Sequence, residues 1–216
     1  MGAVQTAGYV GSQSATAGST TTAFRQDLTG AQVVSLARGA RAEQVRLGQI
    51  FAAFIPPGTG QAPGTAIGTT GAFTLALASG VSYRLVLLKL MVGYISGTLG
   101  AGTLALLAHF SASGSITAPT GGTAITPTNA LLGSNISSQA NCRFNNTVPA
   151  SGLMIRSIAG LQASLASTAV APWQVIDDVD GEVIIGAGQA VSVQGIAAAG
   201  SSPLITVGAI WAEEPT

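Results

Sequence analysis

Charged side chains are scarce in this sequence. Its 216 residues include 8 basic and 8 acidic ones, or 7%, whereas an ordinary soluble domain carries ~25%. A folded monomer of 21.3 kDa exposes ~9,000 Å² of surface, and so few ionised groups solvate that area poorly. The sequence therefore predicts that a protein assembly or a membrane covers much of the surface.

Groups with catalytic or metal-binding chemistry are equally few. The single cysteine, Cys142, excludes an internal disulfide and a cysteine-rich metal site, and we interpret it as a small buried hydrophobe. The single histidine, His109, is interpreted as a strand-end residue held by hydrogen bonds. Residues 178–182 imitate the start of a calcium loop without its distal glutamate, and an Asp-Gly hairpin turn explains them. We therefore expect no enzymatic activity, no cofactor and no metal site.

Nucleic acid and membrane are poor partners for this chain. The formal net charge of zero supplies no basic stripe for nucleic acid. Residues 90–108 are uncharged and long enough to span a bilayer, but they contain several glycines, which disfavour a helix. The runs 157–176 and 183–212 are uncharged as well, so such a run is not distinctive here. We therefore expect protein rather than lipid to cover the surface.

Short apolar segments recur along the chain, separated by Gly, Pro, Ser and Asp-Gly clusters. This spacing is typical of an antiparallel sandwich, barrel or jelly roll. Glycine-rich residues 97–102 predict a hairpin turn between the apolar segments Tyr83–Ile95 and Thr103–Phe110. Residues 43–54 fit helical spacing at some positions and a strand face at others, and we interpret them as a strand. The predicted strands are Tyr83–Ile95, Thr103–Phe110, Gly152–Ile158, Glu182–Ile185, Ala190–Ile196 and Leu204–Trp211.

The composition divides the chain into two parts. Residues 1–30 are mostly small and polar, and we predict an extended low-complexity arm that contacts neighbouring subunits. Residues 31–216 are predicted to form one jelly-roll-like β-sandwich domain. Within it, residues 55–71 read as a Pro/Gly loop, and residues 116–149 as a long Thr/Pro/Asn-rich loop. The predicted fold is therefore all-β, an antiparallel β-sandwich or jelly roll with an extended N-terminal arm.

Charge is sorted along the chain. All eight basic residues and two acidic ones lie within residues 1–156, and the other six acidic residues lie within 157–216. Two interpretations are open: chance among so few charges, or a contact between the basic N-terminal region of one subunit and an acidic surface of its neighbour. The second interpretation predicts a subunit or capsid interface that includes Arg25, Arg38, Arg41 and Arg46.

Three stretches resemble a widespread group of tailed-bacteriophage virion proteins, namely Phe24–Val34, Tyr83–Lys89 and Ile210–Pro215. In that group an Asn-Pro-Gly-Ser-Gly-type turn tends to precede the apolar strand, whereas residues 78–82 here read Ala-Ser-Gly-Val-Ser. The group also tends to close on Trp-Glu-Glu, whereas Ala212 separates the tryptophan from the glutamates here. The likeness extends over most of the chain beyond its first 23 residues.

The resemblance implies a non-enzymatic jelly-roll or β-sandwich cement (decoration) protein on the capsid exterior, assembled in the bacterial cytoplasm and forming a homotrimer. Its partners would be the major capsid protein or other virion proteins, together with further copies of itself. It would stabilise the shell by bridging neighbouring capsid subunits. The arm would order against a neighbour by strand addition and bury Tyr9, Val10 and Phe24.

Other structural roles and one binding role stay open as alternatives. The chain could serve as a neck, tail, baseplate or head-fibre component of the virion. A head fibre that binds host glycans would use Trp173 or Tyr94 beside a loop at Asn141–Asn146. A small membrane protein fits the sequence less well, and an enzyme fits it least.

Overall fold

The computed structural model describes residues 41–56, 58–68, 70–111, 114–148, 152–161, 174–197 and 201–216. The chain divides into two compact units, Met1–Glu43 and Gln44–Thr216, and the β-sandwich belongs to the second. The predicted arm over residues 1–30 and the predicted domain boundary after it lie outside the described residues, so both stay predictions.

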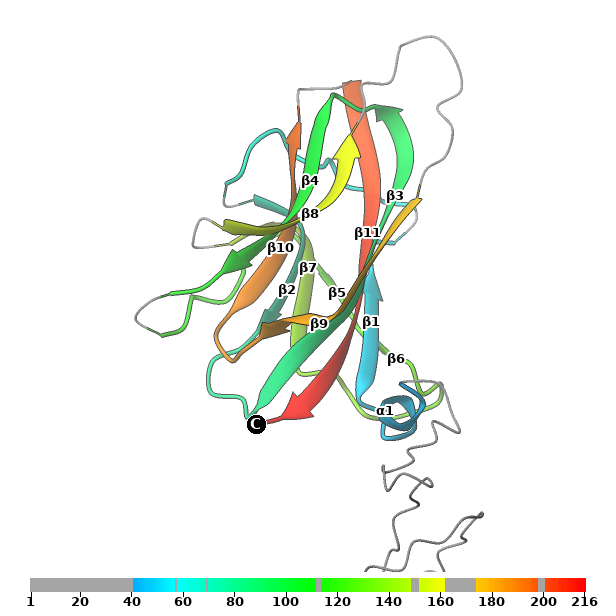
Figure 1. Ribbon diagram of the computed structural model, residues 1–216, viewed down its shortest axis with the longest axis vertical. Helices are drawn as coiled ribbons and strands as arrows, with labels where there is room; N and C mark the ends of the chain where they lie inside the picture. Colours follow the sequence, from blue (N-terminus) through cyan, green and yellow to red (C-terminus); the bar gives the residue numbers. More distant parts are fainter. Residues whose placement is uncertain are drawn as a thin grey trace, which may run out of the picture. The chain divides into compact units, whose positions relative to one another are not determined.

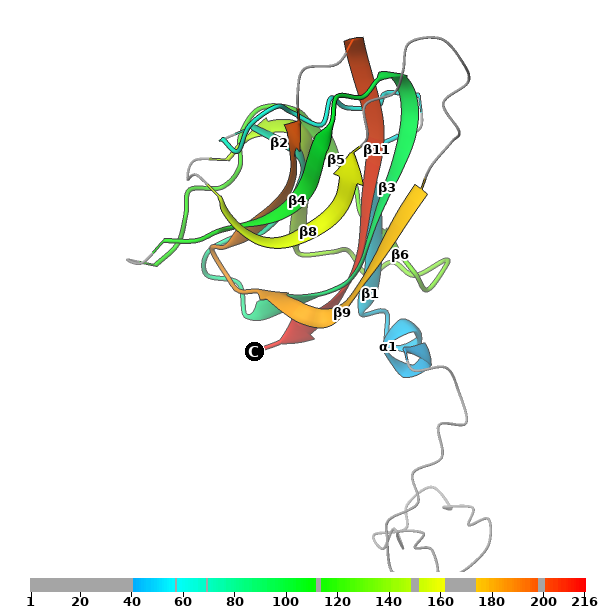
Figure 2. The ribbon, with the colours of Figure 1, turned by 45° about the horizontal axis from the view of Figure 1, so that its top comes forward.

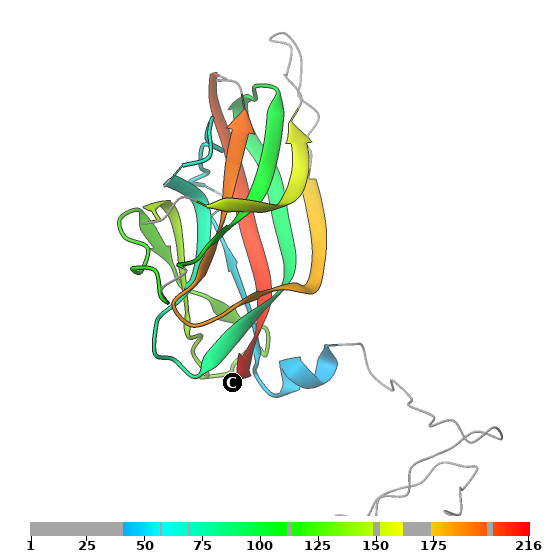
Figure 3. The same ribbon diagram turned by 60° about the vertical axis from the view of Figure 1, so that its left-hand side comes forward.

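Two antiparallel sheets pack face to face as the layers of a sandwich (Figure 1, Figure 3). The five-stranded sheet has the order β6-β1-β11-β3-β9, and the six-stranded sheet has the order β5-β7-β2-β10-β4-β8. The elements are α1 (Ala42–Arg46), β1 (Ile50–Phe54), β2 (Thr70–Leu77), β3 (Tyr83–Thr98), β4 (Gly102–His109), β5 (Thr123–Ile125), β6 (Thr128–Asn129), β7 (Ala140–Thr147), β8 (Leu153–Leu161), β9 (Gln174–Ile185), β10 (Ala190–Ala197) and β11 (Ser201–Pro215).

The strands pair as the two halves of one long antiparallel ribbon. β1 pairs with β11, β2 with β10, β3 with β9, and β4 with β8. The pairs β1–β11 and β3–β9 belong to the five-stranded sheet, where β3 also pairs with β11. The pairs β2–β10 and β4–β8 belong to the six-stranded sheet, where β4 also pairs with β10. A ribbon rolled up in this way has the two-sheet topology of a jelly roll. The predicted antiparallel sandwich of jelly-roll type is therefore confirmed over the described residues.

The core lies between the sheets and follows the period-2 pattern of the strands. The ring of Trp211 on β11 stacks on that of Phe51 on β1, with centroids 6.3 Å apart. Burial alternates from residue to residue in β7, whereas β2 and β4 bury most of their residues on both faces. Further core residues of β2, β10 and β11 are Phe73, Leu75, Leu77, Val191, Val193, Ile205, Val207 and Ala209.

The loop between β1 and β2 covers part of the outer face of the six-stranded sheet. The Gly195 N–H donates to the Pro63 carbonyl at 2.5 Å, and the Gln194 amide exchanges hydrogen bonds with the main chain of Gly68 at 3.0 and 3.1 Å. A Cβ atom at Gly195 would lie 2.7 Å from the Pro63 carbonyl oxygen, so this close approach requires glycine. The predicted Pro/Gly loop is found here, and it ends where β2 begins.

The predicted hairpin around residues 97–102 is wrong in its pairing. Both strands exist, as β3 and β4, but β3 belongs to the five-stranded sheet and β4 to the six-stranded sheet. The connection crosses from one sheet to the other, and Leu99 within it is buried in the core. A glycine-rich turn between two apolar strands suits both arrangements, so the sequence pattern does not distinguish them.

The strand predicted over residues 43–54 forms only in part. The prediction is confirmed for β1, whereas the residues before β1 form the short helix α1. Glu43 lies in the first turn of this helix and Arg46 in its last turn, so both charges complement the helix dipole. The helix is followed by Gly48 with a φ of 68°, a backbone conformation that glycine adopts without strain.

The loop predicted over residues 116–149 is also corrected, because it contains β5, β6 and β7. β7 extends the six-stranded sheet by pairing with β2. Its sequence, Ala-Asn-Cys-Arg-Phe-Asn-Asn-Thr, is polar overall, but Cys142 and Phe144 alternate with less buried neighbours and enter the core. Only three apolar residues, Ala140, Cys142 and Phe144, alternate among the eight, and one of them is a small alanine, so the period-2 pattern is weak in the sequence.

Candidate interaction surfaces

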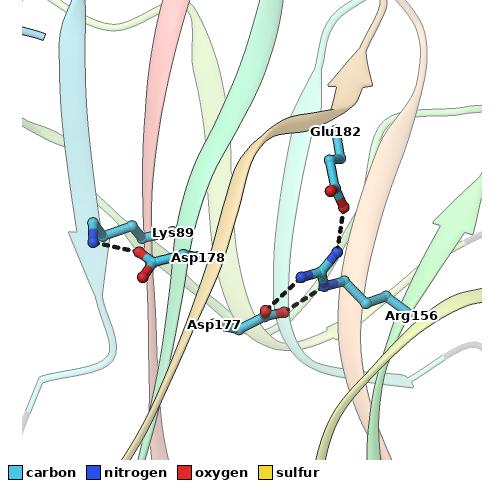
Figure 4. A network of polar contacts seen from close by, with 5 residues as sticks. All are labelled: Lys89, Arg156, Asp177, Asp178 and Glu182. Atoms are coloured by element: carbon cyan, nitrogen blue, oxygen red, sulfur yellow. Dashed lines mark hydrogen bonds and ion pairs between the residues drawn. The ribbon is translucent and has the colours of Figure 1, made fainter. Parts of the chain in front are cut away.

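The strands β8 and β9 lie side by side, each at one edge of its sheet within the described part of the chain (Figure 2). One arginine joins them. Arg156 on β8 donates from Nε and Nη2 to the two carboxylate oxygens of Asp177 on β9, at 2.8 Å each, and from Nη1 to Glu182 (Figure 4). The planar fork of the guanidinium matches the carboxylate geometry. Because both carboxylates belong to the other sheet, Arg156 ties the two edges together.

The same carboxylates keep Arg156 charged. Hydrogen bonds to Asp177 and then to Glu182 raise the pKa of Arg156 above its already high ordinary value, so the guanidinium stays charged. Figure 4 also shows the ion pair of Lys89 with Asp178. That pair is the more exposed of the two, with 46% and 66% of its side chains accessible, so solvent weakens it.

Irregular pairing shapes both edge strands. The register of β8 with β4 shifts at two points and skips Ile155 and Ile158. Within β9, Asp180 and Gly181 adopt φ values of 46° and 89° where the ladder with β3 is irregular. The Asp-Gly pair is thus a bulge inside one strand rather than the predicted hairpin turn. On β8 the irregularity leaves three consecutive apolar residues, Leu153–Ile155, exposed.

Large apolar side chains gather along these two edges. Exposed singly, such residues are ordinary, but together on adjacent edge strands they form a patch of the kind that marks a protein contact. We call this patch the edge strip. Its members, with exposed fractions between 46% and 60%, are Leu153, Met154 and Ile155 on β8, Ile176 and Ile184 on β9, and Phe110 directly after β4.

A cavity of about 420 Å³ opens beside the edge strip. Its lining is mostly apolar and includes Phe110, Ile155 and Ile184. The polar side chains that reach it include the ion pair of Arg156 with Glu182, whose charges already satisfy each other. The cavity therefore suits an apolar group better than a charged ligand.

His109 and Cys142 take structural positions. His109 is buried at the end of β4, with 2.7 Å between its Nε2 and the Ser192 hydroxyl, which confirms the predicted hydrogen-bonded strand-end histidine. Cys142 is buried on β7, and burial raises the pKa of its thiol, with a further increase from the Glu213 carboxylate. The thiol is therefore a packed hydrophobe, as predicted, and not a thiolate.

Metal and membrane signals are missing from the residues that the structure describes. Over those residues, no group of three or more His, Cys, Asp or Glu side chains could hold a metal ion. The described helix is too short, and the same residues contain no other helix long and apolar enough to cross a membrane.

A second apolar patch surrounds the end of α1. Asn129 on β6 organises it, because its Nδ2 donates to the Gly48 carbonyl and its Oδ1 accepts from the Leu131 N–H, both at 2.8 Å. We call this the α1 patch, and its most exposed member, Leu132, is 85% accessible. Its members are Leu47, Leu131, Leu132 and Ile136.

The two patches are well separated. β9, which carries part of the edge strip, and β6, beside the α1 patch, are the opposite edges of the five-stranded sheet in the described residues. Four strand spacings of ~4.8 Å separate these edges. The two patches can therefore contact different molecules at the same time.

Two of the predicted interface residues lie within the described part of the chain. Arg46 lies in the last turn of α1, next to Leu47 of the α1 patch, and Arg41 immediately precedes the helix. The edge strip was not predicted from the sequence, although the consecutive apolar residues Leu153–Ile155 were a usable signal. The other predicted interface residues lie outside the described residues; they are Tyr9, Val10, Phe24, Arg25 and Arg38.

The loop that the glycan-binding alternative predicts is a strand in the structure. Residues Asn141–Asn146 belong to β7, because they pair with β2 rather than forming a loop. Trp211 is fully buried, and the Tyr94 hydroxyl donates to the Gly97 carbonyl at 2.6 Å. Trp173 lies outside the described residues.

The sorting of charge along the sequence is resolved in part within one chain. Arg84 pairs with Glu214, Lys89 with Asp178, and Arg156 with Asp177 and Glu182. Each pair joins a basic residue of the first 156 to an acidic residue of the last 60. These three basic residues thus have acidic partners inside the chain, and none of them is among the predicted interface arginines.

Comparisons of this chain with protein-family models, with curated proteins and with solved structures find no match.

Proposed function

We propose that this chain is a non-enzymatic structural protein of a tailed-bacteriophage virion, a cement (decoration) protein that bridges neighbouring capsid subunits. It would act on the capsid exterior as a homotrimer, with the major capsid protein or other virion proteins as partners. The resemblance in sequence, the jelly-roll topology and the scarcity of charge support this proposal. A fold alone does not imply a function, so the proposal depends mainly on the surface.

The observation that carries the proposal is the pair of separate apolar surfaces. A bridging protein needs two docking sites that can be occupied at once, and the edge strip and the α1 patch stand at opposite edges of one sheet. The α1 patch is aliphatic, and the edge strip is aliphatic apart from Phe110. Such side chains contribute cohesion without the desolvation cost of buried charges. The work of such a protein is binding alone.

The proposal is tested on purified shells prepared with and without the protein. We expect shells that carry it to withstand higher temperature and greater internal pressure before they rupture. Light scattering and electron microscopy after a temperature ramp measure the fraction of intact shells. Equal resistance of the two preparations would show that the protein is not a cement.

A single substitution tests the shell-facing surface. In the variant Leu132→Asp a carboxylate enters the most exposed position of the α1 patch, and we expect at least tenfold weaker occupancy of shells because the charge must be desolvated. The matched control is Ile67→Asp, an exposed apolar position outside both patches. Equal occupancy by the two variants would remove the α1 patch from the proposal.

A further inference from the structure

We propose that the edge strip is the contact surface between copies of this chain, so that the β8–β9 edges of neighbouring copies face one another in the oligomer. The inference rests on the proposed function, since it assigns one docking surface of the bridge to a second copy and leaves the α1 patch for the shell.

The first half of β8 is uncharged and apolar. Proteins guard sheet edges with charges, bulges or prolines that discourage a further strand. β9 has such protection, since four acidic residues and the Asp180–Gly181 bulge interrupt it. The residues Leu153–Ile155 at the edge of the described six-stranded sheet carry no charge. An edge of this kind is stable in water only when another surface covers it.

The edge strip offers enough area for a contact between copies. A large apolar side chain has ~150–200 Å² of surface, so the half-exposed members of the edge strip leave roughly 500 Å² open on each copy. Two facing copies would bury about 1,000 Å² of apolar surface, which is about the least area that a biological interface has. The edge strip is therefore large enough for a second copy.

The charge on the edge strip is compatible with a contact between copies. Copies whose edge strips face one another around a symmetry axis bring like surfaces together, and a strip of one charge sign would repel itself. At the centre of this edge, Arg156 is balanced within its own chain by Asp177 and Glu182. Neighbouring copies therefore meet apolar surface around an internally paired ion cluster. The cavity beside the strip, at about 420 Å³, offers a recess for an apolar side chain of the neighbouring copy, and Phe110 is the aromatic member of the strip.

The test is the native mass of the full chain, purified without any other virion protein. We expect the wild type to form an oligomer with three times the mass of the 21.3 kDa chain. The variants Ile155→Asp and Ile184→Asp, one on each edge strand, are expected to weaken association by about 30-fold or more, the loss typical of a central interface residue. Sedimentation over a concentration series measures this loss.

The matched control is Ile136→Asp, because Ile136 in the α1 patch is 50% exposed and Ile155 is 46% exposed. We expect this control to keep the wild-type mass, and circular dichroism melting curves to show that every variant is folded. If the wild type is monomeric, if both edge variants keep the wild-type mass, or if the control dissociates equally, the inference is wrong.

The outcomes separate the inference from the proposed function. Should shells with and without the protein prove equally stable while the edge variants dissociate, the contact between copies stands and the cement function fails. Should the edge variants keep the wild-type mass while the shells still depend on the protein, the cement function stands and the edge strip is not the contact.

Discussion

The buried carboxylate of Glu213 on β11 offers the sharpest test of the packing described here. Only 4% exposed, it accepts hydrogen bonds from Trp211 Nε1 at 3.1 Å, from the Gln139 N–H at 3.1 and 3.0 Å, and from the Ser138 hydroxyl. In the variant Glu213→Gln one acceptor oxygen becomes an NH₂ donor, and all three contacts lose a charged acceptor. Because a hydrogen bond to a charged group contributes ~1 kcal/mol more than a neutral one, and a neutral amide is easier to bury, we expect a net loss of about 2 kcal/mol.

The matched control stands next to it in the sequence. Glu214 pairs with Arg84 on the surface, with 30% and 47% of the two side chains exposed, so Glu214→Gln should cost less than about 1 kcal/mol. Urea unfolding followed by tryptophan fluorescence gives both free energies of unfolding. Hydrogen exchange should also show faster exchange of the Gln139 amide in Glu213→Gln alone. Equal losses of stability in the two variants, or an unchanged Gln139 amide, would refute the assigned role of Glu213.

Three further predictions concern the sheets. Gly195→Ala should destabilise the sandwich by ~1–3 kcal/mol, because the new Cβ meets main-chain carbonyl oxygens, whereas Gly160→Ala on β8 meets open space and should be neutral or slightly stabilising; urea midpoints compare them. Arg156→Met should lower the thermal midpoint more than Lys89→Met, since only Arg156→Met removes an ion pair between β8 and β9; equal midpoints would contradict the role of Arg156 in joining these strands. Burial raises the pKa of Cys142, so above pH ~8.5 the unfolded thiol ionises before the folded one. Wild-type stability should therefore fall above that pH by up to ~1.4 kcal/mol per unit, a slope that Cys142→Ala should reduce.

The sandwich could be predicted because the central strands have apolar residues in a pattern typical of buried strands. In β10 and β11, core residues alternate with mostly small or polar ones, and a glycine comes shortly before each strand in the sequence. The same local pattern placed His109 at a strand end with polar partners. These predictions depend on neighbouring residues alone, and such residues are what a sequence pattern reports.

The features that escaped prediction depend on contacts distant in sequence. β7 is mostly polar and becomes a strand because β2 presents a free edge beside it. The separation of β3 from β4 follows from the pairing of β3 with β9 and β11, more than 80 residues further along the chain. The exposure of Leu153–Ile155 depends on the strand order of the six-stranded sheet. An apolar triplet in the sequence is compatible with burial and with exposure, and only the topology distinguishes the two.

The nested topology also explains why charge is sorted along this chain. A ribbon that folds its first half onto its second places early residues opposite late ones, and Arg84 faces Glu214 while Lys89 faces Asp178 directly in the ladders. A slip of one residue would separate these pairs and turn the inward side chains of β3 toward solvent. The scarce charges therefore help to set the register of β3 against both of its neighbours. Because these charges are paired within the chain, the edge strip and the α1 patch stay apolar, and burial between molecules is the means of stabilising them.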